Sequence, residues 1–140
     1  MNTGNFIDLR NIPEFPSFHD AELIGLEYDT ETRTLELRLR RVGSELEVLR
    51  FSGVVSQRLI DFASQNVASR LLISPRYPFS RTEVRTWMQW INSRDDSMGA
   101  AIGDQKSDEY VRDLVAGRRV LFVLEPSCGA EMACYVSRFR

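Results

Sequence analysis

The sequence of 140 residues lacks long apolar runs, and none approaches the roughly 18 consecutive apolar residues that a membrane-spanning helix needs. Its first ten residues, MNTGNFIDLR, have neither a basic start nor an apolar core, so a secretory signal is not expected. With 43% hydrophobic and 27% charged residues, the composition is typical of a globular protein. We therefore expect a cytoplasmic protein with no membrane partner.

Cysteine and histidine are also scarce. A disulfide between Cys128 and Cys134 would close a loop of about six residues, which constrains the unfolded chain little. Two reduced thiols are therefore expected. The single histidine, His19, has no cysteine near it in the sequence, whereas a zinc site needs several imidazole or thiolate ligands. The sequence predicts no metal site.

The motifs of common cofactor and nucleic-acid binders are missing. The sequence contains no P-loop, no dinucleotide-binding fingerprint and no cluster of basic and aromatic residues suited to RNA. Asp95, Asp96 and Asp104 fall in one loop, but the calcium-loop pattern D-x-D-x-D-G is absent, so a solvated loop is the better interpretation. We predict no cofactor and no nucleic-acid partner.

Charge is distributed unevenly along the chain. Residues 1–31 hold seven acidic residues and one basic residue, a net charge of −6, whereas residues 32–140 have a net charge of +4. An acidic segment is a poor surface for nucleic acid, but it suits a basic protein partner. A solvated face without a partner is the simpler interpretation.

Two stretches of alternating apolar and polar residues follow this acidic start. In LIGLEYD, residues 23–29, a shared face is predicted for Ile24, Leu26 and Tyr28. In TLELRLR, residues 34–40, three leucines alternate with polar residues. Such alternation indicates strands with one buried face. The intervening TETR suits a hairpin loop of about four residues.

The next segments are less regular. ELEVLRFSGV, residues 45–54, shifts its alternation at Leu49, which indicates a bulge or twist there. VVSQRLIDFASQNV, residues 54–67, fits either helical spacing or irregular edge structure. VASRLLIS, residues 67–74, predicts a strand that Pro75 ends.

Two helices are predicted from their caps and apolar spacing. SRTEVRTWMQWINSR begins with Ser80 and places Glu83 three residues later, which is a capping box. SDEYVRDLVAG has Ser107 as a predicted N-cap, Asp108 and Glu109 in the first turn and Gly117 just past the end. The apolar stripe of the first helix consists of Val84, Trp87, Met88 and Ile91.

The C-terminal segment predicts a β-hairpin. VLFVL, residues 120–124, is apolar on both faces, as in a central strand, and MACYVSRF alternates again. Between them, EPSCGAE supplies the turn, with Gly129 at positive φ. Residues 1–140 are therefore predicted to form a single α+β domain: a mostly antiparallel sheet of about six strands with two helices packed on one face.

The pair His19–Asp20, in the segment FHDA, has three interpretations. Adjacent residues of a strand point to opposite faces, so a catalytic dyad would need an irregular backbone. The leading interpretation is structural, with the imidazole bonding a loop to a strand and Asp20 capping a turn. Partner binding is an alternative, and so is catalysis by Cys128, His19 and Asp20 together.

Several segments together resemble a group of small bacterial proteins. The segments are SFHDAELIGLEYD, TLELRLR, LRFSGV, QNV and FVLEPSCGAEMACYVS. Members of that group begin with Phe-His-Asp-Ala/Ser and end with a Gly-containing hairpin, and some resemble immunity proteins of polymorphic toxin systems. The resemblance implies a cytoplasmic binding protein that is not an enzyme, and it supplies no catalytic residues.

The leading hypothesis is therefore a non-enzymatic domain that binds another protein, such as a basic toxin. Trp90 lies at the edge of its helix stripe and would suit an interface, as would the long loop that follows it. One alternative is a small enzyme or ligand-binding domain that uses His19 with Cys128 or the loop aspartates. Another is a self-assembling protein whose edge strands pair into a homodimer. The predicted partner-binding residues are His19, Asp20, Trp90, Asp95, Asp96 and Met98.

Overall fold

The computed structural model describes residues 5–6, 18–43, 46–93 and 101–139. These described residues form seven strands and two helices, which confirms the predicted α+β class. The strands are β1 (Asn5–Phe6), β2 (Glu22–Asp29), β3 (Thr34–Arg40), β4 (Leu46–Ile60), β5 (Val67–Ile73), β6 (Val120–Cys128) and β7 (Glu131–Phe139). The helices are α1 (Arg81–Ile91) and α2 (Asp104–Val115).

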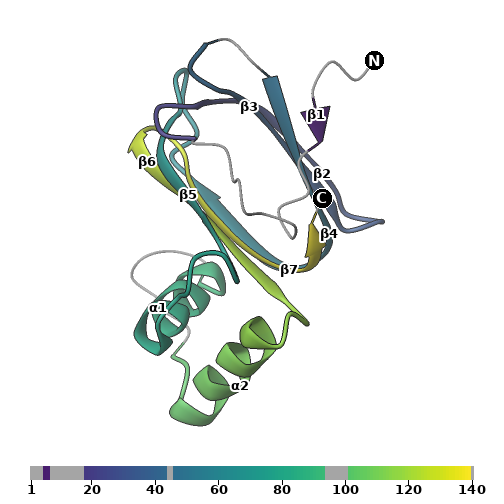
Figure 1. Cartoon of the computed structure of the whole chain (residues 1–140), viewed down its shortest axis with the longest axis vertical. Coiled ribbons are helices and arrows are strands. Elements are labelled where there is room, and N and C mark those ends of the chain that lie inside the picture. Colours follow the sequence, from purple (N-terminus) through teal and green to yellow (C-terminus); the bar gives the residue numbers. More distant parts are fainter. Residues whose placement is uncertain (1–4, 7–17, 44–45, 94–100, 140) are drawn as a thin grey trace.

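The sheet closes on itself. Its strand order is β1-β4-β3-β2-β5-β6-β7, and β7 also pairs with β4. The pairings from β2 to β7 are antiparallel, whereas β1 adds in parallel beside β4, so the prediction of a mostly antiparallel sheet is confirmed. The narrowest junction joins β2 to β5 at the pair Glu22↔Val67. Because the sheet is closed, it has an inner and an outer face (Figure 1).

The inner face holds the larger hydrophobic core, which includes the three alternating leucines of β3. In β2, the prediction that Ile24 shares a face with Leu26 and Tyr28 is wrong. The pairing of β2 with β3 shifts between Leu23 and Gly25, so that Leu23 is 2% exposed and Ile24 is 38% exposed. A bulge of this kind adds one residue and thereby exchanges the two faces of the strand.

The long strand β4 corrects the prediction made at Leu49. The β3–β4 pairing runs through this residue without a shift, and Val48 and Leu49 are both buried because both faces of β4 are covered there. The register shift lies further along, between Val54 and Ser56, against β7. The stretch whose spacing was ambiguous continues as strand to Ile60 and then becomes a loop.

Both helices pack on the outer face of β5, β6 and β7, which confirms their predicted position on one face (Figure 1). In β6, Leu121 and Val123 face the helices while Phe122 and Leu124 face the inner core, which explains why VLFVL is apolar throughout. Within the described ranges, no helix combines the length and apolarity needed to cross a membrane. The core beneath the helices consists of Leu72, Val84, Met88, Ile91, Leu114, Leu121, Val123, Ala133 and Tyr135.

The start of α1 follows its sequence signals, and the start of α2 does not. Glu83 N donates to Ser80 Oγ at 3.1 Å and Ser80 N donates to Glu83 Oε1 at 2.8 Å, which confirms the capping box. Helix α2 begins at Asp104, with Gly103 at its N-cap. The prediction of Ser107 as N-cap is wrong, because this residue lies inside α2, fully buried, and its Oγ donates to Gly103 O at 3.0 Å.

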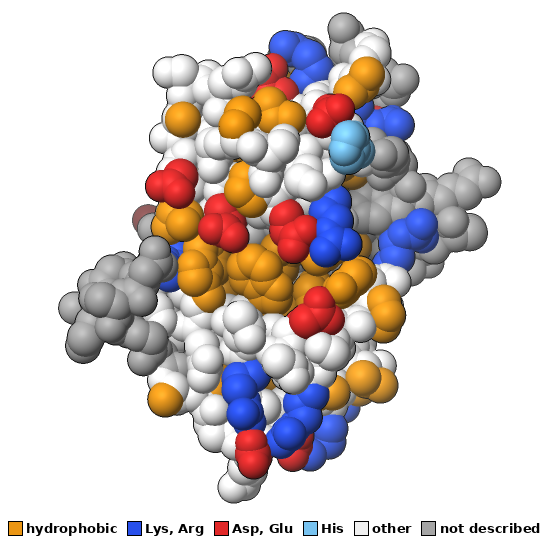
Figure 2. Space-filling model, turned by 90° about the vertical axis from the view of Figure 1, so that its left-hand side faces the viewer, with side chains coloured by type: hydrophobic (Ala, Val, Ile, Leu, Met, Phe, Trp, Pro, Cys, Tyr) orange, Lys and Arg blue, Asp and Glu red, His pale blue; other side chains and the backbone are white. Residues whose placement is uncertain are grey.

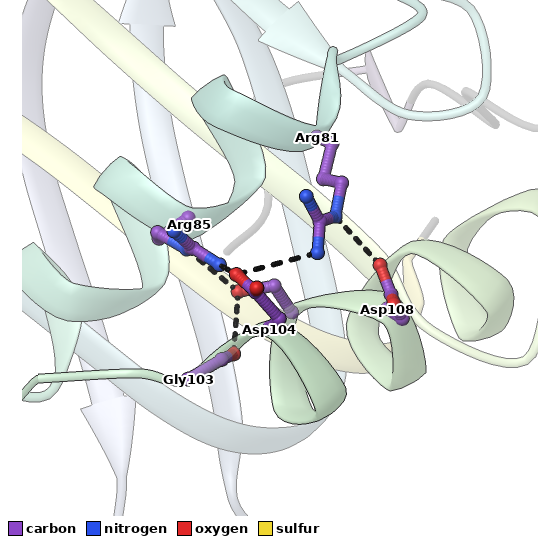
Figure 3. A network of polar contacts seen from close by, with 6 residues as sticks. Arg81, Arg85, Gly103, Asp104 and Asp108 are labelled. Atoms are coloured by element: carbon purple, nitrogen blue, oxygen red, sulfur yellow. Dashed lines mark hydrogen bonds and ion pairs between the residues drawn. The ribbon is translucent and has the colours of Figure 1, made fainter.

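An ion-pair network joins the two helices (Figure 3). Arg81 Nε lies 2.6 Å from Asp108 Oδ1, and Arg81 Nη2 lies 3.4 Å from Asp104 Oδ1. Arg85 pairs with Asp104 and donates from Nε to Ser107 Oγ at 3.0 Å. The hydrogen bond and positive charge of Arg85 hold the pKa of Asp104 below its usual value. Asp104 is therefore a partner in an ion pair between α1 and α2.

Candidate functional site

The FHDA segment forms a tight turn. Ala21 N donates to Phe18 O at 2.9 Å, so His19 and Asp20 occupy the two central positions. Phe18 and Ala21 are buried, at 3% and 0% exposure, whereas the side chains of His19 and Asp20 are 70% and 58% exposed. The segment therefore anchors itself in the core at both ends and presents its two polar side chains to solvent.

An irregular backbone at Asp20 brings these two polar side chains together. Asp20 has a φ of 64°, in the left-handed region that Asp tolerates better than most residues. Nδ1 of His19 lies 3.3 Å from Oδ2 of Asp20. The opposite-facing geometry expected of a regular strand therefore does not apply here. Asp20 N donates to Ala68 O at 2.9 Å, which fixes the turn to β5.

Asn66 joins three segments from inside the molecule, where it is 4% exposed. Its Oδ1 accepts from Ala63 N at 2.8 Å and from Ala130 N at 2.9 Å, and its Nδ2 donates to Ala63 O at 2.9 Å. Its backbone O accepts from Leu23 N at 2.8 Å. One buried residue thus connects the 61–66 loop, the β6–β7 turn and the start of β2.

The turn between β6 and β7 is shorter than the predicted EPSCGAE turn. Strand β6 continues to Cys128 and β7 begins at Glu131, which leaves Gly129 and Ala130 between them. Gly129 has the predicted positive φ, 77°. A Cβ at this position would also clash with the backbone O of Gln65, so the turn requires glycine for its conformation and for its close contact.

These contacts bring three segments into one surface, which we call the loop cluster: residues 18–21, residues 61–66, and residues 125–131, which comprise the end of β6, the turn and the first residue of β7. In Figure 1 the three segments lie side by side at the end of the molecule opposite the helices. FHDA, QNV and EPSCGAE, which are distant in the sequence, supply most of this surface. These three segments are therefore neighbours in space, whereas TLELRLR and LRFSGV lie in β3 and β4.

The loop cluster is acidic. Its three segments contain no lysine or arginine, and the arginine that pairs with Glu125 comes from β5, at Arg70. Figure 2 views this side of the molecule and shows the imidazole at the surface with an acidic side chain beside it. Such a surface attracts cationic groups and repels phosphate backbones. The carboxylates of the loop cluster are Asp20, Asp61, Glu125 and Glu131.

Trp90, a predicted contact residue, lies partly buried in α1, on the helix side of the molecule. Its ring packs edge-on against Trp87, with 5.6 Å between centroids, and the guanidinium carbon of Arg58 lies 4.7 Å from its centroid. Arg58 Nη1 also donates to Trp90 O at 3.2 Å. These contacts hold α1 on β4 and do not bring Trp90 to the loop cluster. The other predicted contact residues, Asp95, Asp96 and Met98, lie outside the described residues.

Phe62 and Asn66 of the loop cluster were not among the residues predicted from the sequence to bind a partner, and neither were Asp61, Glu125 and Glu131. Phe62 is 53% exposed, in the stretch whose spacing fitted either a helix or irregular edge structure. The available signal was Asp61, because Asp after a strand often marks a left-handed turn, and Asp61 has a φ of 59°. No comparable signal distinguishes Asn66, since loop asparagines are usually exposed.

The two thiols have different surroundings. Cys134 is fully buried, and burial raises the pKa of its thiol. Cys128 is exposed in the loop cluster, with Sγ 4.0 Å from Gln65 O, while the imidazole of His19 lies against Asp20. Among the described residues, no three His, Cys, Asp or Glu side chains are grouped to hold a metal ion.

A polar groove and an apolar cavity lie away from the loop cluster. The polar groove, of about 320 Å³, crosses the outer face of β2, β3 and β4, where Arg50 Nε donates to Glu36 Oε2 at 2.8 Å. The apolar cavity, of about 200 Å³, lies between the 74–79 loop and the helices. The cavity is lined by Ser74, Pro75, Tyr77, Pro78, Phe79, Val84, Val111, Leu114 and Val115.

Comparison of the chain with protein-family models, curated proteins and solved structures finds no match. The loop cluster combines exposed carboxylates, an exposed aromatic ring and a backbone fixed by buried residues, which is an arrangement suited to contact with another macromolecule.

Proposed function

We propose that this protein is a non-enzymatic cytoplasmic domain that binds another, basic protein, in the manner of an immunity protein that neutralises a toxin. The observation that carries this proposal is the loop cluster, in which three distant segments present carboxylates without a lysine or arginine among them. The resemblance of FHDA and EPSCGAE to segments of immunity-like proteins supports the same function.

The rigidity of the loop cluster favours binding. Phe18 and Ala21 anchor one loop in the inner core, and the buried side chain of Asn66 ties the other two together. A surface that is already ordered loses little conformational entropy when a partner binds. Its carboxylates would steer a basic partner during diffusion, with an association rate that falls as salt is added.

Expression beside the product of the neighbouring gene tests this function. The expected result is that the two proteins co-purify at equal stoichiometry, and that cells making the neighbouring protein survive when this chain is present. Failure to bind that protein, together with no effect on cell survival, would reject the proposal.

A small enzyme is a second candidate, because the fold brings Cys128 into the same loop cluster as His19 and Asp20. Thiol labelling separates the two functions. A nucleophilic cysteine reacts faster than a free thiol at neutral pH because its thiolate is stabilised. We expect Cys128 to label at the rate of free cysteine, with no change in a His19→Ala variant, while buried Cys134 labels after unfolding.

Self-assembly through edge strands is disfavoured by the closure of the sheet. In an open sheet of the same order, β7 would be one edge and the two-residue strand β1 the other. Pairing of β7 with β4 occupies the long edge strand. Light scattering of the purified protein is expected to give the mass of one chain, 16.1 kDa. A stable dimer would instead support the hypothesis of self-assembly.

A further inference from the structure

We propose that Phe62 is the anchor of the loop cluster, and that it inserts into an apolar pocket, bordered by lysine or arginine, on the basic partner. This inference rests on the proposed function and specifies how the contact is made. It depends on the exposure of Phe62, on the fixed backbone around it and on the charges of the loops beside it.

Exposure of this ring is unusual within the molecule. Phe62 is the one aromatic residue among the large apolar side chains that are exposed in the described ranges, at 53%. An exposed phenylalanine forgoes much of the free energy that its burial would supply, and large aromatic side chains are frequent anchors in protein interfaces. The other exposed apolar residues are Ile24, Val42, Val55 and Val115.

The backbone on both sides of Phe62 is held in place. Asp61 turns the chain at a φ of 59° immediately after β4 ends. On the other side, Ala63 exchanges two hydrogen bonds with the side chain of Asn66, at 2.8 Å and 2.9 Å. The loop that carries the ring is therefore ordered before binding, which reduces the entropy that association would cost.

A short series of contacts links this loop to the FHDA turn. Asn66 O accepts from Leu23 N at 2.8 Å, and Asp20 N donates to Ala68 O at 2.9 Å. The exposed carboxylates of Asp20 and Asp61 thus belong to the same rigid unit as the ring. Carboxylates on the same surface as an apolar anchor call for cationic side chains beside the complementary pocket. A second copy of this chain fits less well, because it would present the same negative charges.

Truncation of the ring tests the anchor. The purified product of the neighbouring gene serves as the probe, and its Kd is measured by calorimetry against the intact chain and its variants. We expect Phe62→Ala to raise the Kd by about 30-fold or more, as for other buried interface anchors. Phe62→Tyr keeps the ring and should stay close to the unmodified chain.

Val115→Ala provides the matched control, because Val115 is 79% exposed on α2, at the other end of the molecule. We expect it to leave the Kd unchanged. Circular dichroism of each variant shows whether the fold is retained. An unchanged Kd for folded Phe62→Ala would overturn the anchor while leaving the protein-binding function in place.

The charges are tested by Asp20→Asn and Asp61→Asn. Asparagine also tolerates the left-handed region, so these variants remove charge without straining the backbone. We expect each variant to lower the association rate constant several-fold at low salt and to weaken its salt dependence. Glu31→Gln, in the exposed β2–β3 turn, is the control for general charge and should have a smaller effect.

The outcomes distinguish this inference from the proposed function. If the neighbouring protein does not bind the intact chain, both are rejected. If it binds, and neither the ring nor the charges matter, the contact lies elsewhere and this inference alone is rejected. If light scattering shows a dimer of the intact chain that Phe62→Ala dissociates, the ring serves a second copy and the inference is rejected as well.

Discussion

At Asp20 a single backbone angle determines what the FHDA segment presents. The φ of 64° lets Ala21 N reach Phe18 O, so that two apolar residues enter the core and two polar residues stay outside. Glycine, Asn and Asp reach this region at low cost, whereas a β-branched residue does not. The residue at this position therefore has to suit the left-handed backbone conformation.

Replacement of Asp20 separates the effect of the backbone conformation from that of the carboxylate. We expect Asp20→Val to lower the free energy of unfolding by about 1–2 kcal/mol through backbone strain. Asp20→Gly should change it by a few tenths, because the exposed contact with His19 contributes little. Urea unfolding measures both. Equal losses in the two variants would mean that the carboxylate, and not the φ angle, maintains the turn.

Asn66 is the residue on which the geometry of the loop cluster depends most. Asn66→Ala leaves Ala63 N and Ala130 N without their acceptor, and Ala130 N is buried. We expect a loss of about 2–4 kcal/mol in the free energy of unfolding, since an unsatisfied buried donor costs about 1–3 kcal/mol. Ser64→Ala, at an exposed position of the same loop, should be nearly neutral. A loss no greater than that of the control would contradict the role assigned to Asn66.

At the scale of elements, the two helices are held together by ion pairs between their side chains as well as by apolar packing. Asp104 lies at the first turn of α2 and receives hydrogen bonds and charge from Arg85 of α1 (Figure 3). Because the pKa of Asp104 is lower in the folded chain than in the unfolded chain, its contribution to stability is present above the ordinary value of 3.8. This contribution is lost as the pH falls through the folded pKa.

Asp104→Asn tests this contribution through its pH dependence. We expect the variant to be less stable than the intact chain at pH 6, and the difference to shrink as the pH falls below 3.8, where the unfolded carboxyl becomes protonated. Arg85→Gln should show the same trend, and the double variant should lose little more than either single variant. Urea unfolding at several pH values provides the measurement. Fully additive losses would show that the two residues act independently.

At the scale of the whole molecule, the closed sheet has one strong and one weak junction. Strands β4 and β7 pair from Phe51 to Ile60, whereas β2 and β5 meet at the bridge between Glu22 and Val67. Local opening of a structure takes place where the fewest contacts have to be broken. The junction between β2 and β5 is therefore where the sheet should open first, in rare excursions from a folded state in which the loop cluster is ordered.

Hydrogen exchange tests where the sheet opens. The amides of Leu23 and Ala68, which bond across the β2–β5 junction, should exchange faster than those of β4 that bond to β7. Exchange of both groups at a common rate, equal to that of global unfolding, would show that the sheet opens as one unit.

The sequence by itself determined those elements whose signals are local. Alternation placed the strands around the leucines of β3, and Ser80 with Glu83 predicted the start of α1, because side-chain period and capping depend on near neighbours. Tertiary structure decided the bulge that turns Ile24 outward, the burial of Ser107 and the closure of the sheet. It also decided that FHDA, QNV and EPSCGAE meet around Asn66. Contacts between segments distant in the sequence produce no periodic pattern of residues. This surface could therefore not be predicted before the pairing of the strands was known.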